Sequence, residues 1–492
     1  MATAGMADPI MLPQPAGRQP WHPAAISSPA SPLARGASLA FGRRFFYLLS
    51  LALALWLPAL ARPQFSLWVG VYCAVILGLW IWDLCRLPAV SDWNIERSWS
   101  APPHLGGGMQ VIWQLACKTR HGSSRCTIEM RWQDDLPMAL TGASADEPWT
   151  QTAVWPAGHP SRTITSARTL HPCQRGVQTC GDLYLQFQST WGLAVRRGRA
   201  RLTQSVMVLP DLEAARHQAL PAMLDLPLAR EMRPTRTRAR GREFEALRPF
   251  REGDEWRDLD WRATARAGRW IVKQRRSERN QMVWLVLDCG RLLQARPSGT
   301  SLHSLLDITT TAALSLAMAA SFGGDQVGLL AYGREIQILQ PPAAGQGMAG
   351  QVRRILPALG QLRQESSEAD HRRAASLLLR LQKRRAFIVW LSELPETAFV
   401  PELAEAGSLL ARRHLLLLTL PEPTEVEALA GQPPRQARDM YVITAALEML
   451  QRRRRALARL RDQGAQVLEI PAARITAAVV ERYMRIKERG DL

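Results

Sequence analysis

The chain has 492 residues, 47% hydrophobic and 21% charged, a composition that excludes wholesale disorder and leaves room for about two to four domains. Lysine and arginine outnumber aspartate and glutamate by 62 to 43, and the net charge of +19 favours polyanionic partners such as nucleic acid, anionic lipid or an acidic protein. None of the seven cysteines forms a Cys-x-x-Cys pair, so zinc-finger spacing is absent and reduced thiols are expected.

The N-terminal part predicts a disordered tail followed by a membrane anchor. Residues 1–40 are rich in proline, alanine, serine and glycine without any period. Within residues 41–88, the apolar runs 45–61 and 65–82 each approach the roughly 20 residues that a transmembrane helix needs. A buried helical hairpin of a soluble core is the alternative, but neither run has a polar face. Arginines flank the pair on both outer sides, which predicts a bacterial inner-membrane protein whose soluble domains face the cytoplasm.

Residues 90–210 predict a β-rich, sandwich-like module. Short segments with alternating or β-branched residues are separated by glycine, proline, serine and aspartate, at residues 110–115, 127–132, 181–187 and 202–209. Four cysteines fall in this part, at Cys117, Cys126, Cys173 and Cys180. They could pair in an oxidising compartment, but the predicted cytoplasmic topology argues against disulfides.

Residues 211–280 read as a basic connector, with arginines spaced through residues 233–242. A nucleic-acid-binding arm is one interpretation of such a segment. The glutamates that follow and the neighbouring membrane anchor favour a solvated or lipid-facing surface instead.

Residues 281–492 predict a doubly wound α/β domain. Apolar strands at 282–287, 327–332, 335–339, 387–391, 415–420 and 466–470 alternate with helices at 302–322, 350–359, 371–384, 400–413, 446–463 and from about 475. Ligands of such sheets bind at the carboxyl ends of the strands. Asp288 and Glu393 follow two of these ends.

No motif in the chain predicts catalysis. Gly345, Gly347 and Gly350 match G-x-G-x-x-G, but they do not follow the first strand, so we interpret them as a loop before a helix. Phosphate-loop, zinc-protease and nucleophile-elbow motifs are absent. We expect His303 and His414 to be exposed helix residues, and we expect no enzymatic activity.

Residues 249–266 resemble the signature of the domain-of-unknown-function 58 family, in which a Gly-Asp, an arginine, a tryptophan and an Ala-Arg precede a von Willebrand factor A-like domain. Further landmarks of that family are matched in the same order at residues 171–177, 189–193, 325–332 and 483–487. The resemblance implies a membrane-anchored protein, often paired with a MoxR-type AAA+ ATPase. Its implied role is assembly or adaptor work through protein contacts, and no enzymatic activity is established for the family.

The signature also predicts an interaction surface. Its key residues are Gly253, Asp254, Arg257, Asp260, Trp261 and Arg266. Gly253 suits a turn, Arg257 and Asp260 suit a helical ion pair, and Trp261 is expected to bury against the sheet. The plainer interpretation is that this element only docks the connector onto the α/β domain.

The resemblance implies a metal-ion-dependent adhesion site, which this sequence carries in degenerate form. Asp288 keeps the first carboxylate, but Gly290 and Leu292 stand where that site has serines, and Glu393 replaces the later aspartate. Ser366 or Ser367 could stand near its threonine. We therefore expect no cofactor and no tight divalent-metal binding. Two alternatives stay open: a metal-dependent enzyme or ligand-binding domain centred on Asp288, and a nucleic-acid-binding protein.

Overall fold

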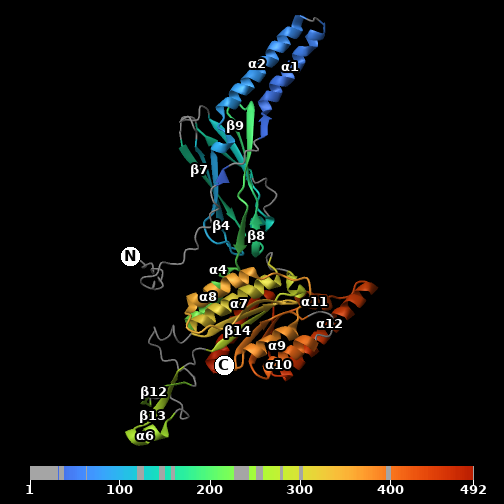
Figure 1. The fold of residues 1–492 in the computed structure, drawn as a ribbon. Helices are drawn as coiled ribbons and strands as arrows, with labels where there is room; N and C mark the ends of the chain where they lie inside the picture. The colour runs from blue at the N-terminus through green and yellow to red at the C-terminus, as the bar shows by residue number, and fades with distance from the viewer. Residues whose placement is uncertain are drawn as a thin grey trace, which may run out of the picture.

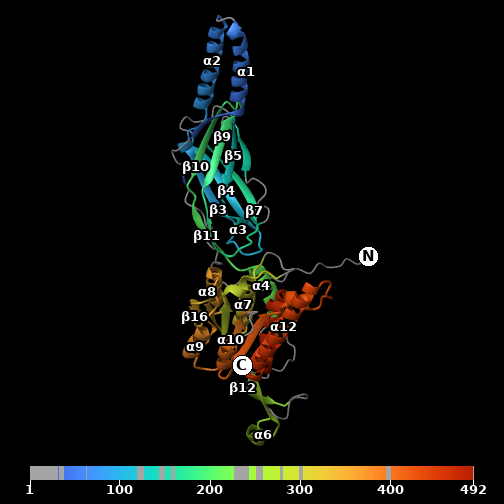
Figure 2. The same cartoon turned by 90° about the vertical axis from the view of Figure 1, so that its right-hand side faces the viewer.

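The computed structural model describes residues 31–32, 38–61, 64–118, 127–142, 150–156, 161–225, 243–250, 259–276, 281–297, 303–394 and 401–490. Three parts follow one another along a long axis: a pair of helices, a β module and an α/β region (Figure 1). A β-hairpin extends from the α/β region at the end opposite the helix pair (Figures 1 and 2).

The helix pair consists of α1 (Arg43–Ala61) and α2 (Gln64–Arg86), which pack side by side. Among the described residues, two helical segments are long and apolar enough to cross a membrane, Leu67–Asp92 and Leu305–Phe322. They differ in burial, because the second lies almost wholly inside the α/β core whereas most of the first is exposed. The pair is therefore a separate apolar element rather than part of a protein core.

Part of the predicted disordered tail is ordered. β1 (Ser31–Pro32) and β2 (Ser38–Phe41) pair antiparallel with two strands of the β module. The prediction of disorder was therefore wrong for these residues, because the neighbouring strands offer them free edges. Residues 1–30 lie outside the described residues.

The β module has two main sheets and a separate two-stranded sheet around one core. One sheet has the order β1-β3-β4-β7 and the other β2-β10-β9-β5-β6, while β11 pairs with β8. The bounds are β3 (Trp93–Trp99), β4 (Met109–Lys118), β5 (Ile128–Asp134), β6 (Thr150–Trp155), β7 (Ser161–Leu170), β8 (Gly176–Cys180), β9 (Leu183–Ser189), β10 (Ala194–Ala200) and β11 (Gln204–Val208), with the short α3 (Met138–Thr141). Strand residues alternate between buried and exposed, as the sequence pattern predicted.

The α/β region contains a six-stranded sheet of order β16-β15-β14-β17-β18-β19, parallel except for β16. Numbered along the chain, this is the doubly wound order 3-2-1-4-5-6, so the predicted α/β architecture is confirmed. The strands are β14 (Met282–Asp288), β15 (Gln326–Tyr332), β16 (Ile336–Gln340), β17 (Phe387–Leu391), β18 (Leu415–Pro421) and β19 (Gln466–Ile470).

Helices cover both faces of this sheet (Figure 1). One face carries α4 (Leu212–Asp225), α7 (Leu305–Phe322), α8 (Met348–Gln361) and α13 (Ile475–Arg489). The other carries α9 (His371–Leu381), α10 (Pro401–Ala411) and α12 (Ala437–Asp462), and α11 (Thr424–Ala430) packs on α12. Two features were not predicted: α12 begins well before residue 446, and α4 forms a packed helix inside the expected connector.

The hairpin consists of β12 (Glu243–Pro249) and β13 (Ile271–Arg276), with α6 (Trp261–Ala267) at its tip. These elements make their principal contacts with one another. A two-stranded hairpin with one short helix buries little apolar surface, so its own stability is marginal.

Candidate functional site

Asp288 lies at the carboxyl end of the central strand β14, next to the point where the strand order reverses. Its Oδ1 accepts a hydrogen bond from the Gly290 amide at 2.8 Å, and its Oδ2 accepts one from the Ser392 hydroxyl at 2.7 Å. The side chain is buried, and burial raises the pKa of the Asp288 carboxyl above its usual range. Both oxygens therefore already have protein donors.

A buried polar chain lies beside this carboxylate. The Trp390 indole donates to the Tyr332 hydroxyl at 2.7 Å, and that hydroxyl lies 2.8 Å from Nδ1 of His371. Burial lowers the pKa of His371, while the charge of Asp288 opposes that shift. His371 was not predicted as a site residue from the sequence. The one sequence signal for it is that it follows an aspartate, Asp370, at the start of a helix.

Glu393 does not complete a metal site with Asp288, because it bonds to other groups. Its Oε1 accepts hydrogen bonds from the Leu394 amide at 2.9 Å and from the Arg453 guanidinium at 2.7 Å. Arg453, on α12, also donates to Glu469 and to the Pro421 carbonyl, each at 2.6 Å. The guanidinium of Arg453 thus pairs with both strand-end carboxylates on this side of the sheet.

The loop after β14 is closely packed rather than open. A Cβ at Gly290 would lie 3.1 Å from both Ala369 and the Asp288 carboxylate. Leu292 lies in the short 3-10 turn after it and has no oxygen in its side chain. The predicted serine segment does lie against this loop, because the Arg291 amide donates to the Ser367 carbonyl at 3.0 Å. Within the described residues, no group of three or more histidine, cysteine, aspartate or glutamate side chains is arranged to hold a metal ion.

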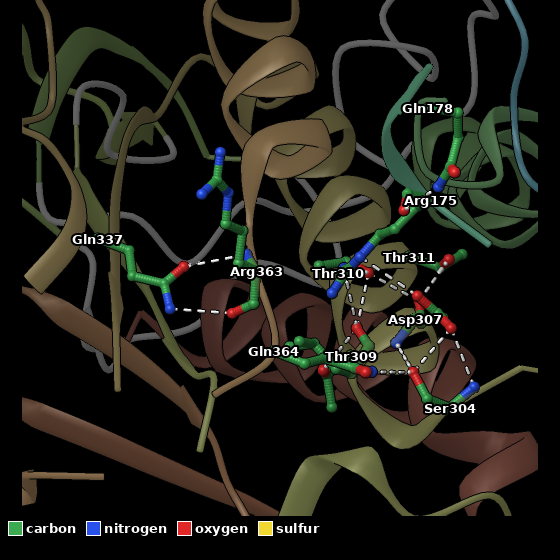
Figure 3. Close-up of polar contacts among 11 residues, drawn as sticks. Arg175, Gln178, Ser304, Asp307, Thr309, Thr310, Thr311, Gln337, Arg363 and Gln364 are labelled. Carbon is green, nitrogen blue, oxygen red and sulfur yellow. Dashed lines mark hydrogen bonds and ion pairs between the residues drawn. The ribbon is translucent and has the colours of Figure 1, made fainter. Parts of the chain in front are cut away.

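An arginine of the β module reaches the same end of the α/β region (Figure 3). Nε of Arg175 lies 3.2 Å from Asp307 in the first turn of α7, and its guanidinium also donates to the Thr310 hydroxyl at 2.6 Å. The Arg175 side chain is only 4% exposed, so this ion pair is desolvated. Asp307 also forms the capping box of α7 with Ser304.

Arg175 was not singled out from the sequence, although it lies in a landmark of the resemblance, residues 171–177. The next residue, Gly176, has a φ of 100°, a left-handed backbone that only glycine adopts without strain. The Arg-Gly pair therefore makes the turn that carries the guanidinium across the boundary between the two parts.

Of the signature residues, Asp260, Trp261 and Arg266 lie far from these strand ends, in the projecting hairpin (Figure 1). Gly253, Asp254 and Arg257 lie outside the described residues, so the predicted pair between Arg257 and Asp260 stays a prediction. The Asp260 carboxylate caps α6, accepting from the amides of residues 262 and 263 at 3.0 and 3.1 Å.

Three expectations about single residues were wrong. Trp261 does not bury against the sheet but is 67% exposed on α6, because the hairpin extends away from the sheet. His414 is not an exposed helix residue but lies buried just before β18. His303 is partly buried and lies just before α7 rather than in a helix. Arg266, in the last turn of α6, is exposed as an interaction residue must be.

Comparison with known proteins gives one family. The family model described as "Protein of unknown function DUF58" matches residues 246–458. Curated relatives include "Uncharacterized protein Rv1480" of Mycobacterium tuberculosis and "Uncharacterized protein Mb1516" of Mycobacterium bovis. Each is 25% identical over 187 residues, which cover 38% of this chain and 57% of the relative. The chain thus spans just over half the length of these relatives.

Solved structures with some likeness include "von Willebrand factor type A from Catenulispora acidiphila", at 12% identity and a TM-score of 0.28, covering 44% of each chain. Another is "conserved hypothetical protein BatB from Bacteroides thetaiotaomicron", at 13% identity and a TM-score of 0.26, covering 42% of this chain and 99% of that one. These scores are low, so the order of the six-stranded sheet remains the observation on which the fold rests.

Proposed function

Because this chain belongs to the DUF58 family through its residues 246–458, we propose that it is a membrane-anchored adaptor that acts by binding other proteins. The binding element in this proposal is the projecting hairpin, defined as β12, α6 and β13.

The observation that carries the proposal is the exposure of Trp261 on this hairpin. A tryptophan that is 67% exposed on a solvent-facing helix leaves a large apolar ring in water. Tryptophan and arginine are the residues that most often dominate protein interfaces, and three exposed arginines lie near it, at Arg262, Arg266 and Arg269. A marginally stable hairpin with such a surface gains stability when a partner covers it.

The charge of the hairpin supports an acidic partner. Six basic residues follow Asp260 in the sequence of the hairpin: Arg262, Arg266, Arg269, Lys273, Arg275 and Arg276. Complementary charge would speed association with an acidic surface. On family resemblance, we propose a MoxR-type AAA+ ATPase as that partner.

The helix pair supports the membrane anchor. α1 and α2 have 19 and 23 residues, close to the length that spans a bilayer, and apolar side chains such as Leu53 and Trp68 are exposed on them. The flanking Arg43, Arg44 and Arg86 favour a hairpin with both ends in the cytoplasm. Protease added to right-side-out spheroplasts should then spare residues 90–492, and digestion there would reverse this orientation.

The binding proposal is tested by co-purification of the full chain, in mild detergent, with a MoxR-type ATPase. Trp261→Ala and the double variant Arg257→Glu with Arg266→Glu should each lower the recovered ATPase at least tenfold, because they remove the aromatic anchor or reverse the charge. Tyr441→Ala is the matched control, since Tyr441 is 79% exposed on α12, outside the hairpin. Unchanged recovery in both hairpin variants would move the interface elsewhere.

A further inference from the structure

The turn between β9 and β10, residues 189–193, bonds directly to the end of α2. The Asp83 side chain of α2 is fully buried, and its carboxylate accepts hydrogen bonds from the Ser189 hydroxyl at 2.5 Å and from the amides of Leu193 and Ala194 at 3.2 and 2.9 Å. A buried carboxylate with three protein donors is strongly held, because losing them would leave its charge unsolvated. Asp83 therefore locks α2 onto the turn.

The start of α1 bonds to the same turn. The Arg44 guanidinium donates to the Thr190 carbonyl at 2.8 Å, and the Gly42 amide donates to the Leu193 carbonyl at 2.8 Å. A Cβ at Gly42 would lie 1.8 Å from the Gly192 carbonyl oxygen, so only glycine permits this approach. Both helices are thus hydrogen-bonded to the β module where they meet it, and no free linker separates them from it.

A second arginine donates hydrogen bonds at the C-terminal end of α2. Arg196 of β10 donates to the carbonyls of Leu84 and Pro88, each at 3.0 Å. These carbonyls lie at and just beyond the helix end, where intrahelical partners are missing. The helix pair and the β module are therefore one joined body at this junction.

The outer surface of the junction carries aromatic and basic side chains. Trp191 of the turn is 50% exposed and packs edge-to-face on Trp82 of α2, with ring centroids 5.7 Å apart. The Arg86 guanidinium lies 4.4 Å from the centre of the Trp82 ring, and Arg43 is exposed at the start of α1. Tryptophan and arginine at the ends of apolar helices are typical of the membrane–water interface.

We infer that the 189–193 turn lies at the level of the lipid headgroups, and that Arg43 and Arg86 bind anionic phospholipid there beside Trp82 and Trp191. The inference rests on the membrane anchor proposed above. The exposed apolar surface of α2 continues directly from Trp82, so a bilayer covers the apolar and the basic side chains together, as a soluble acidic protein would not.

The consequence concerns the orientation of the whole molecule. Because the β module is hydrogen-bonded to both helices and contacts the headgroups, its orientation relative to the membrane is fixed. A flexible linker would leave that orientation free. The hairpin of β12, α6 and β13 lies at the opposite end of the long axis (Figure 2). The junction thus holds the β module at a fixed distance from the bilayer, and the proposed binding element lies on the side of the molecule away from the membrane.

The test measures the depth of single fluorescent labels in the full chain, reconstituted into phosphatidylcholine–phosphatidylglycerol vesicles. Labels are placed at Cys73, at Trp191→Cys and at Trp270→Cys, each in a background without the other accessible thiols. That background replaces Cys85, Cys126 and Cys173, and also Cys73 where it is not the label, by serine. The remaining Cys117, Cys180 and Cys289 are buried. Lipids that carry a spin label at a shallow or a deep position in the bilayer then quench the fluorescence of each label.

Cys73 reports the anchor, since it lies about 15 Å along α2 from Asp83 at 1.5 Å per residue, near the middle of a bilayer core about 30 Å thick. We expect deep quenching at position 73 and shallow quenching at position 191. Trp270, equally half-exposed but on the projecting hairpin, should give no quenching. Quenching at 73 without any at 191 would overturn this inference alone, whereas no quenching at 73 would overturn the membrane anchor and the inference with it.

The lipid preference is tested with the label at position 191 and headgroup-matched quenchers. Spin-labelled phosphatidylglycerol should be enriched over spin-labelled phosphatidylcholine by about fivefold per arginine, the preference typical of one basic residue at an anionic surface. Arg43→Gln with Arg86→Gln should remove this enrichment, while Arg269→Gln, an exposed arginine on the distant hairpin, should retain it. Equal quenching by both lipids in the unmodified chain would overturn the anionic-lipid assignment.

Discussion

The strand-end face of the α/β sheet and the projecting hairpin use charged residues in opposite ways. At the strand ends, Asp288 accepts from Gly290 and Ser392, and Glu393 is paired with Arg453. On the hairpin, Trp261 and the arginines of α6 are exposed to solvent. The region where this fold class usually binds ligands is therefore internally satisfied, and the surface suited to a partner lies outside the sheet.

The difference indicates that the polar groups at the strand-end face hold parts of the molecule together. Arg175 joins the β module to the start of α7, and Arg453 joins α12 to the ends of three strands. Removing a cation from such a place leaves a poorly solvated carboxylate, which destabilises the fold. Removing a side chain from the hairpin leaves only water where a partner would bind.

The largest effect is expected for Arg175→Ala, which leaves Asp307 without its buried partner at the junction with the β module. We expect the free energy of local opening at the start of α7 to fall by about 4 kcal/mol. Native-state hydrogen exchange of the α7 amides measures this. Arg372→Ala is the control, because Arg372 and its partner Glu405 are 63% and 56% exposed, and such pairs contribute about 1 kcal/mol or less. Similar losses in both variants would contradict a special role for Arg175.

A somewhat smaller loss is expected for Arg453→Ala. Its side chain is 13% exposed and pairs with both Glu393 and Glu469, so about 3 kcal/mol should be lost from the free energy of unfolding of the α/β region. The neighbouring Arg452 offers a matched control, since it is 45% exposed and forms only an i,i+4 pair with Glu448. Urea unfolding of the two variants compares them directly, and equal midpoints would show that Arg453 is not a structural cation.

Trp261→Ala should change stability by less than about 0.5 kcal/mol, because an exposed side chain loses little packing when truncated. The same variant is expected to lose partner binding, so the two measurements together separate an interaction residue from a structural one. A loss of stability comparable to that of Arg453→Ala would favour the plainer interpretation, in which the signature only docks the connector.

The sequence predicted the α/β region well because each of its strands is a continuous apolar run and its helices are amphipathic. The strand β17, for example, matches the predicted residues 387–391. The roles of the charged residues were not predictable, because they depend on contacts between distant segments. Arg175 and Asp307 are 132 residues apart in the chain, and no local pattern links them. The prediction for Trp261 was wrong for a different reason. Its apolar character predicted burial, but the hairpin extends away from the sheet and leaves the ring exposed.

The smallest effect is expected when divalent metal is added. Gly290 and Leu292 supply no oxygen side chains, and both Asp288 oxygens already accept from protein donors. Burial also raises the pKa of Asp288, so a proton competes with any cation for that carboxylate. Mg²⁺ requires a nearly complete octahedron of oxygens, and water would have to supply most of it in a closely packed loop. Calorimetric titration of the detergent-solubilised chain with Mg²⁺ and Mn²⁺ should therefore give no binding heat beyond dilution. Micromolar binding that disappears in Asp288→Ala would contradict this expectation and return the ligand site to the strand ends.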